Sequence, residues 1–153
     1  MKLEKILVPL DFSKSSEMAF IYAKFLAKKF SAAIHLLHVV DKRYVERISE
    51  FNGESEEEIS RKLSLQAKEK LEHFLSNNGS EGLVAERTVS VGVVFQTVAL
   101  KAQVLGADVI VMGGHGRVGN GQIDKIFFGS AAERVVRLLP CPVLCVPQHV
   151  AGI

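Results

Sequence analysis

Glycine is concentrated in one stretch of the chain, Val111 to Glu133, which reads VMGGHGRVGNGQIDKIFFGSAAE and holds six of the twelve glycines. Gly113, Gly114 and Gly116 follow an apolar run directly. Glycine lets the backbone adopt positive φ angles or approach a ligand closely, because it has no Cβ. The stretch therefore indicates a loop that holds a ligand after a buried strand.

Gly129 and Ser130 stand where a helix is expected to begin. Free N–H groups and the positive end of the helix dipole make such a position suitable for phosphate. Ser130 and Glu133 also have the spacing of a capping box, which explains the serine without any ligand. Taken alone this pair favours capping, and the upstream glycines shift the balance toward phosphate.

Two side chains of the loop could touch a ligand, His115 and Arg117. Arg117 could pair with phosphate, although a solvated charge is the more common role. His115 is expected to order the loop or to lie beside a ligand, since no Ser, Cys or carboxylate is spaced to make it a base. The other histidines, among them His35 and His38 on opposite faces of one strand, form no metal set.

Asp11 follows the first apolar run, KILVPL, at the expected carboxyl end of a strand. Its carboxylate could accept hydrogen bonds from ribose hydroxyls or lie near a metal-bound phosphate. It could equally cap the following helix together with Ser13. The two roles are compatible.

Two nucleotide motifs fit the sequence poorly. GHGRVG, residues 114–119, matches the dinucleotide pattern GxGxxG, but it follows a late strand and the next strand, VLCV, carries no acidic residue. No glycine is followed by Lys and Ser or Thr at P-loop spacing. Neither a dinucleotide fingerprint nor a Walker motif is therefore predicted.

Apolar runs of strand length alternate with segments of helical period along the whole chain. Strands are expected over 5–10, 32–40, part of 83–91, 107–113 and 142–147, and helices over 13–30, 55–78, 95–105 and from 130 onward. Residues 41–54 form a polar stretch with no assigned element. The βαβαβαβαβ order predicts an α/β fold, a single domain over 1–153 with a mostly parallel, doubly wound sheet and helices on both faces.

In doubly wound sheets a ligand binds at the carboxyl ends of the strands where the winding reverses. The loop PLDFS after the first strand and the loop GGHGRVGNG after the fourth would face each other there. One site could use both loops.

Composition argues against several function classes. The formal net charge of +2 gives little attraction to nucleic acid, and no run approaches the ~20 apolar residues of a membrane span. With Cys141 and Cys145 expected as reduced thiols, a cytoplasmic location is predicted. The short apolar edge strand Val143–Val146 favours pairing with a second copy of the chain.

Four blocks of the sequence together resemble the universal stress protein family: KILVPLDFS, IHLLHVVD, ADVIVMGGHGR and GSAAERVVRLLPCPVLCVP. The resemblance implies a Rossmann-like domain, similar to the adenine nucleotide alpha hydrolases, with strand order 3-2-1-4-5. It also implies a homodimer formed through the last strand. One branch of the family binds ATP through a motif written G-x2-G-x9-G-S/T.

Carried onto this sequence, that motif assigns three groups of residues. The adenosine pocket would comprise Pro9, Leu10, Asp11 and Val39; the ribose and phosphates would meet Met112, Gly113 and Gly116; and the helix start would bind phosphate through Gly129, Ser130 and Ala131. One departure stands out, since twelve residues separate Gly116 from Gly129 where the family has nine.

The resemblance predicts an ATP-binding module, with AMP or ADP as related ligands and Mg²⁺ on the phosphates. Hydrolysis is expected to be slow at most, because the chain shows no dedicated base, Walker lysine or arginine finger. A true nucleotide hydrolase or transferase using Asp11 and His115 is one alternative. A nucleotide-free stress protein acting through protein contacts is another, which the longer spacing makes credible.

Overall fold

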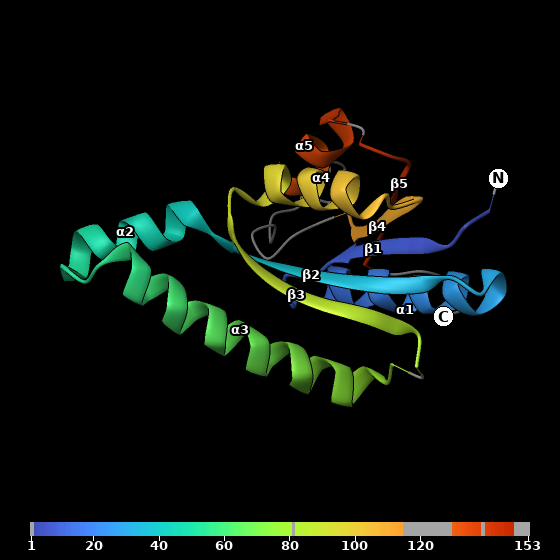
Figure 1. The fold of residues 1–153 in the computed structure, drawn as a ribbon, viewed down its shortest axis with the longest axis horizontal. Helices are drawn as coiled ribbons and strands as arrows, with labels where there is room; N and C mark the ends of the chain where they lie inside the picture. Colours follow the sequence, from blue (N-terminus) through green and yellow to red (C-terminus); the bar gives the residue numbers. More distant parts are fainter. Residues whose placement is uncertain (1, 81, 115–129, 139, 149–153) are drawn as a thin grey trace.

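The computed structural model describes residues 2–80, 82–114, 130–138 and 140–148, and its centre is a five-stranded parallel sheet (Figure 1). The strands lie in the order β3-β2-β1-β4-β5, and all four pairs are parallel. Their bounds are β1 Lys5–Pro9, β2 Ala33–Asp41, β3 Val84–Gly92, β4 Val109–Gly113 and β5 Val143–Val146. The predicted α/β fold and the strand order implied by the resemblance are confirmed.

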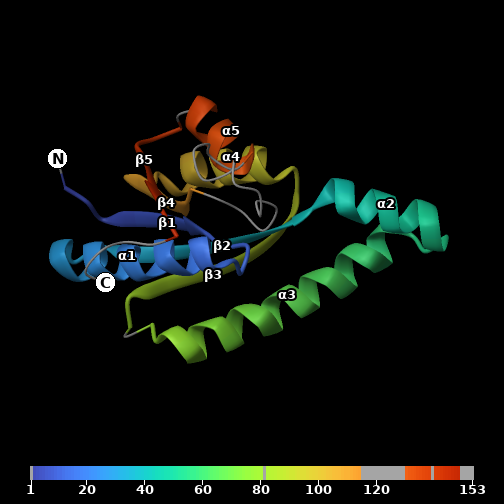
Figure 2. The same ribbon diagram turned by 180° about the vertical axis from the view of Figure 1, so that it is seen from behind.

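Helices cover both faces of this sheet, as predicted (Figures 1 and 2). They are α1 Lys14–Phe30, α2 Lys42–Asn52, α3 Glu56–Asn78, α4 Val94–Leu105 and α5 Ser130–Leu138. One face carries α1 and α3, and the other carries α4 and α5. Figure 2 shows α2 and the adjoining part of α3 extending beyond the end of the sheet.

Each face of the sheet has its own apolar core. Ile6 and Val8 of β1 pack under α1 and α3, whereas Leu7 of the same strand packs under α4 and α5. All three side chains are fully buried. The near-continuous apolar run of β1 follows from this burial on both faces, which is usual for a central parallel strand.

Helix α2 lies in the polar stretch to which the sequence pattern assigned no element. It begins after Asp41, whose side chain caps it, and ends at Gly53 in the left-handed conformation. Val45 is its only fully buried residue, and it packs against Val40 and Ile59. Tyr44, Val45, Ile48 and Phe51 repeat at helical spacing, so the helix has a local signal that the polar composition of the segment obscured.

The remaining helices follow their predicted bounds within a few residues. Ser55 caps α3 by accepting a hydrogen bond from the N–H of Glu58, as the capping box predicted. Gly106 ends α4 in the left-handed conformation. Phe30 continues the apolar helical spacing of Ala19, Ala23 and Leu26, which predicts an inward side chain, but in the last turn of α1 it is about half exposed at 51%.

Candidate functional site

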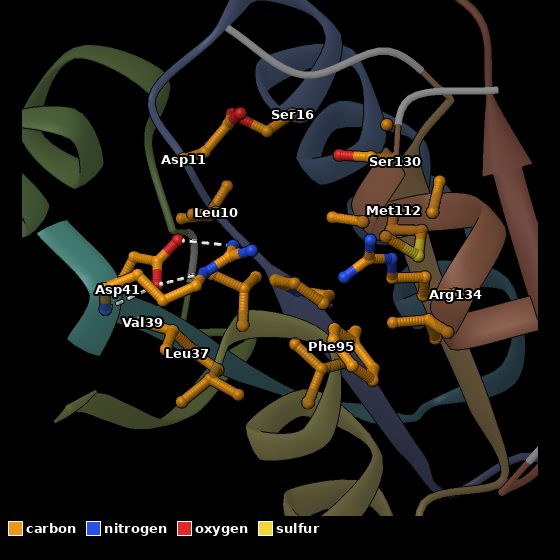
Figure 3. Close-up of a pocket in the computed structure, with 18 residues that line it drawn as sticks. Leu10, Asp11, Ser16, Leu37, Val39, Asp41, Phe95, Met112, Ser130 and Arg134 are labelled. Carbon is orange, nitrogen blue, oxygen red and sulfur yellow. Dashed lines mark hydrogen bonds and ion pairs between the residues drawn. The ribbon is translucent and has the colours of Figure 1, made fainter. Parts of the chain in front are cut away.

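A cavity of about 400 Å³ lies at the carboxyl ends of β1, β2 and β4, where the winding of the sheet reverses beside β1 (Figure 3). The first turns of α4 and α5 close its other sides. Its walls comprise Pro9, Leu10, Asp11, Ser16, Leu37, Val39, Asp41, Arg43, Val94, Phe95, Val98, Met112, Gly113, Ser130, Ala131, Ala132, Arg134 and Val135. The cavity therefore brings the loop after β1 together with Gly113, where the second loop that the sequence pointed to begins.

Eight of the twelve predicted site residues lie in the described part of the chain, and all eight line this cavity: Pro9, Leu10, Asp11, Val39, Met112, Gly113, Ser130 and Ala131. His115, Gly116, Arg117 and Gly129 lie outside the described residues, and so does the twelve-residue spacing. The geometry thus brings separate segments together, while the role of these residues in binding stays a prediction.

The turn from β1 into α1 is organised by Asp11. Ser13 donates its backbone N–H (3.0 Å) and its hydroxyl (2.5 Å) to Oδ1 of Asp11. The hydroxyl oxygen of Ser13 in turn accepts from the N–H of Ser16 at 3.2 Å and caps the helix. Asp11 therefore supports the helix start through Ser13 and lines the cavity as well, so both sequence interpretations of this carboxylate are geometrically compatible.

Phe12, the next residue, has a φ of 62°, which an aromatic residue rarely adopts. Its ring stacks on His38 with 4.7 Å between centroids and meets the ring of Phe74 at 6.2 Å. Nδ1 of His38 donates to the carbonyl oxygen of Leu10 at 2.7 Å. Contacts on the α3 side of the sheet thus hold the turn that carries Asp11.

Gly113 ends β4 at the cavity, and its lack of a side chain has a packing reason. A Cβ at this position would lie 2.5 Å from Oγ of Ser15 and 2.8 Å from the Ser15 carbonyl carbon. Its φ is not in the positive region that favours glycine. The sequence predicted that such glycines adopt positive φ or allow a ligand to approach. At Gly113 the structure shows a different requirement for glycine, the close contact between β4 and α1.

Asp41 and Arg43 form an ion pair on the cavity wall that the sequence analysis did not predict. Arg43 donates from Nε to Oδ1 of Asp41 (3.1 Å) and from its terminal nitrogen to Oδ2 (2.7 Å). These hydrogen bonds are the main reason that the pKa of Asp41 is lowered. The sequence did hold one indication of a role for Asp41: it ends the second strand, at the same edge of the sheet as Asp11.

Phe95 and Arg134 form a second wall that the sequence did not suggest. Cζ of Arg134 lies 5.1 Å from the centroid of the Phe95 ring, and Figure 3 shows the arginine reaching into the cavity from α5 on the side of Phe95. Arg134 follows Ser130 by one helical turn, so the two share a helix face. That spacing was the only sequence signal for this arginine.

Metal-binding groups and membrane-spanning helices bear on the function class. Within the described residues, no three His, Cys, Asp or Glu side chains are grouped so that they could hold a metal ion. No helix in the described ranges is both long enough and apolar enough to cross a membrane.

Residues 2–147 match the universal stress protein family. The chain is 30% identical to universal stress protein MJ0577 of Methanocaldococcus jannaschii, over 95% of each chain. It is 33% identical to MJ0531 of the same organism, over 95% of this chain and 82% of that protein. A solved structure of MJ0577 matches with a TM-score of 0.82 at 31% identity, over 99% of this chain and all of that one.

More distant structures share the fold. One is a universal stress protein in complex with cAMP, with a TM-score of 0.63, 21% identity and 97% and 100% of the two chains covered. Another is the Archaeoglobus fulgidus protein in complex with dAMP, with a TM-score of 0.60, 22% identity and 95% and 99% covered. The family match, the two curated relatives and the strand order agree, and the chain belongs to the universal stress protein family.

Proposed function

We propose that this protein is a nucleotide-binding module of the stress response that holds an adenine nucleotide, ATP ahead of AMP or ADP, in the cavity described above. The observation that carries the proposal is that segments far apart in sequence together form the wall of one cavity. Leu37, Val39 and Val98 give it an apolar part, while Asp11 and Ser130 give it polar groups. Its volume of about 400 Å³ lies within the ordinary range for small-ligand sites.

Each part of the nucleotide has a matching surface. Pro9, Leu10 and Val39 would border the adenosine, and Asp11 would accept hydrogen bonds from the ribose hydroxyls. The N–H groups of Ser130 and Ala131, at the start of α5, would bind phosphate with the help of the helix dipole. Gly116 and Gly129 enter this assignment from the sequence motif alone.

Two neighbours of this fold support the choice of an adenine ligand. The structures solved with cAMP and with dAMP show that universal stress proteins of this architecture accommodate an adenine nucleotide. We propose that Mg²⁺ would arrive on the phosphates, because no group of three ligating side chains lies among the described residues. Asp11, a carboxylate on the cavity wall, would meet such an ion.

We further propose that the protein acts as a nucleotide-dependent switch with slow hydrolysis at most. No lysine is found among the described residues that line the cavity, so that wall offers no Walker-type lysine for a transferring phosphate. We place this activity in the cytoplasm, which the two unbridged thiols of Cys141 and Cys145 support. A homodimer formed through β5 completes the proposal.

The direct test is mass spectrometry of small molecules released from freshly purified protein, followed by calorimetric titration with ATP and Mg²⁺. Release of ATP, ADP or AMP, or calorimetric binding of ATP, would support the proposal. A protein that is empty and also fails to bind ATP with Mg²⁺ would overturn it.

A charge placed at the helix start tests where the phosphates lie. Ser130→Asp should weaken ATP binding at least tenfold and leave adenosine binding nearly unchanged, because a carboxylate repels phosphate while still suiting the helix N-terminus. Ser55→Asp makes the same change at the start of α3, away from the cavity, and should leave ATP binding unchanged. Equal ATP affinities in the two variants would contradict the assignment.

A further inference from the structure

Arg134 occupies an unusual position for an exposed arginine. It projects from α5 onto the cavity wall, and its guanidinium lies over the ring of Phe95 from α4, with 5.1 Å between Cζ and the ring centroid. This distance is within the ~6 Å range of a cation–π contact. Two helices thereby contribute one composite surface to the cavity (Figure 3).

The charges near Arg134 distinguish it from its neighbours. Arg137, three residues further along α5, forms an ion pair with Glu133 at 2.8 Å. Arg43, across the cavity, forms one with Asp41 at 2.7 Å. No carboxylate of the described residues pairs with Arg134. Its recorded contact there is the Phe95 ring. An arginine on a cavity wall that pairs with no carboxylate of the described ranges is available to a ligand.

The location of the guanidinium favours the base of a nucleotide over its phosphates. Phe95 belongs to the apolar wall, with Val94 and Val98 of α4 and Val39 of β2. The proposed phosphate site lies one turn earlier, at the start of α5. A guanidinium is planar and weakly hydrated, so it stacks on aromatic rings on either of its faces. With Phe95 beside it, the guanidinium can accept a flat heterocycle on its open side, as arginine does with nucleic acid bases.

We infer that Arg134, backed by Phe95, is a ligand-binding residue on which the purine base of the ligand stacks. This inference rests on the proposed nucleotide binding and adds a residue that the glycine motif does not include. It predicts that Arg134 contributes to affinity through the base, and therefore equally for ligands with and without phosphate.

Calorimetric titration of adenosine, AMP and ATP with Mg²⁺ into wild type, Arg134→Gln and Arg134→Lys tests the inference. Arg134→Gln should weaken all three ligands by a similar factor, about 5- to 30-fold. Arg134→Lys keeps the charge without the planar group, so its adenosine affinity should stay low. Arg137→Gln, a matched change off the cavity wall, should leave all three affinities unchanged.

The outcomes are separable. A loss confined to ATP would identify Arg134 as a phosphate partner and overturn base stacking, and unchanged affinities would show that it does not contact the ligand. Wild-type protein that binds none of the three ligands would overturn the proposed function, and this inference with it.

A double-mutant cycle with Phe95→Leu tests the composite surface. If Phe95 acts by backing the guanidinium, the combined variant should lose less adenosine affinity than the product of the two single losses. If the loss of adenosine affinity in the double variant equals the product of the two single losses, the two side chains act independently, which would overturn their joint role. Thermal unfolding of Phe95→Leu, compared with wild type, separates a lost contact from a lost fold.

Discussion

At the scale of single residues, the cavity depends on two backbone positions that the protein uses for its own packing. Gly113 brings β4 against α1, and Phe12 turns the chain between Asp11 and Ser13. Neither contact involves a ligand, yet both set the position of residues on the cavity wall. Changes at these positions should therefore alter stability first.

Gly113→Ala should destabilise the protein by about 1–3 kcal/mol, the usual cost of overpacking a core. The new Cβ would meet the Ser15 backbone, which cannot rotate away. Gly92→Ala is the matched control, because there the Cβ would meet the side chain of Thr97, which can change its rotamer. Urea unfolding followed by circular dichroism measures both, and an equal cost for the two variants would contradict this account.

Phe12→Ala should be less stable than Phe12→Gly by about 1 kcal/mol. Both variants lose the contacts with His38 and Phe74, but alanine keeps the unfavourable left-handed conformation that glycine adopts freely. Ser31→Gly is a control at the other non-glycine residue of positive φ in the described ranges, and it should not lose stability. Thermal unfolding checks the order, and an alanine variant as stable as the glycine variant would refute the argument.

At the scale of elements, a charged cluster ties the edge strand β3 to its neighbours. Glu86 of β3 accepts hydrogen bonds from Lys101 of α4 (2.9 Å) and from Thr88 (3.0 Å), and it lies 3.1 Å from Nδ1 of His35 on β2. These partners, Lys101 foremost, lower the pKa of Glu86 to about 2. The cluster thus joins one strand to a helix and to a second strand.

The stabilisation from Glu86 should depend on pH. Its folded-state pKa lies below the unfolded value of 4.5, so the contribution is complete above pH 4.5 and is lost as the pH falls toward 2. Because the Glu86 side chain is 44% exposed, solvent screening limits the effect to about 1 kcal/mol. Glu86→Gln should therefore be less stable than wild type at pH 7, and this gap should shrink as the pH falls from 4.5 toward 2.

Urea unfolding at pH 7, 5 and 3 measures that gap. Glu72→Gln removes a carboxylate whose ion pair with Arg87 is more exposed, and it should change stability by less than about 0.5 kcal/mol at each pH. A gap for Glu86→Gln that stays constant from pH 7 to pH 3 would show that the cluster does not act through the charge of Glu86.

At the scale of the whole molecule, β5 is the edge through which we propose that two copies pair. The carbonyl of Pro142 accepts a hydrogen bond from Ile110 of β4, and the carbonyl of Val146 accepts one from Gly114, which directly follows β4. Since a strand alternates with a period of two, the backbone groups of Val143 and Cys145 point to the open edge. These groups are the ones that a second copy would use.

Cys145→Pro should convert the proposed dimer to a monomer. Proline has no backbone N–H, so the variant loses a hydrogen-bond donor at the open edge of β5 and keeps every N–H that bonds to β4. Cys145→Ser keeps the N–H at the open edge and should remain dimeric. Sedimentation velocity measures the mass of each form, with circular dichroism as the check on folding. A monomeric wild type, or a folded proline variant that is still dimeric, would rule out pairing through this edge.

The sequence alone determined the alternating elements, their helix caps and the edge of the sheet where a ligand would bind. These features depend on residues near one another in the chain: apolar periodicity, Ser55 with Glu58, and Asp11 after the first strand. The polar helix α2 was missed although Val45, Ile48 and Phe51 lie at helical spacing, because the segment is polar overall.

Only the tertiary structure decided which distant side chains meet. It placed Arg134 over Phe95, Phe12 against His38, and Gly113 against Ser15. Each pair joins two elements whose approach is set by strand order and by packing across the sheet, and no local spacing encodes that approach. Short-range patterns therefore predicted the scaffold and the place of the site, whereas the surfaces that would select a ligand emerged from contacts between elements.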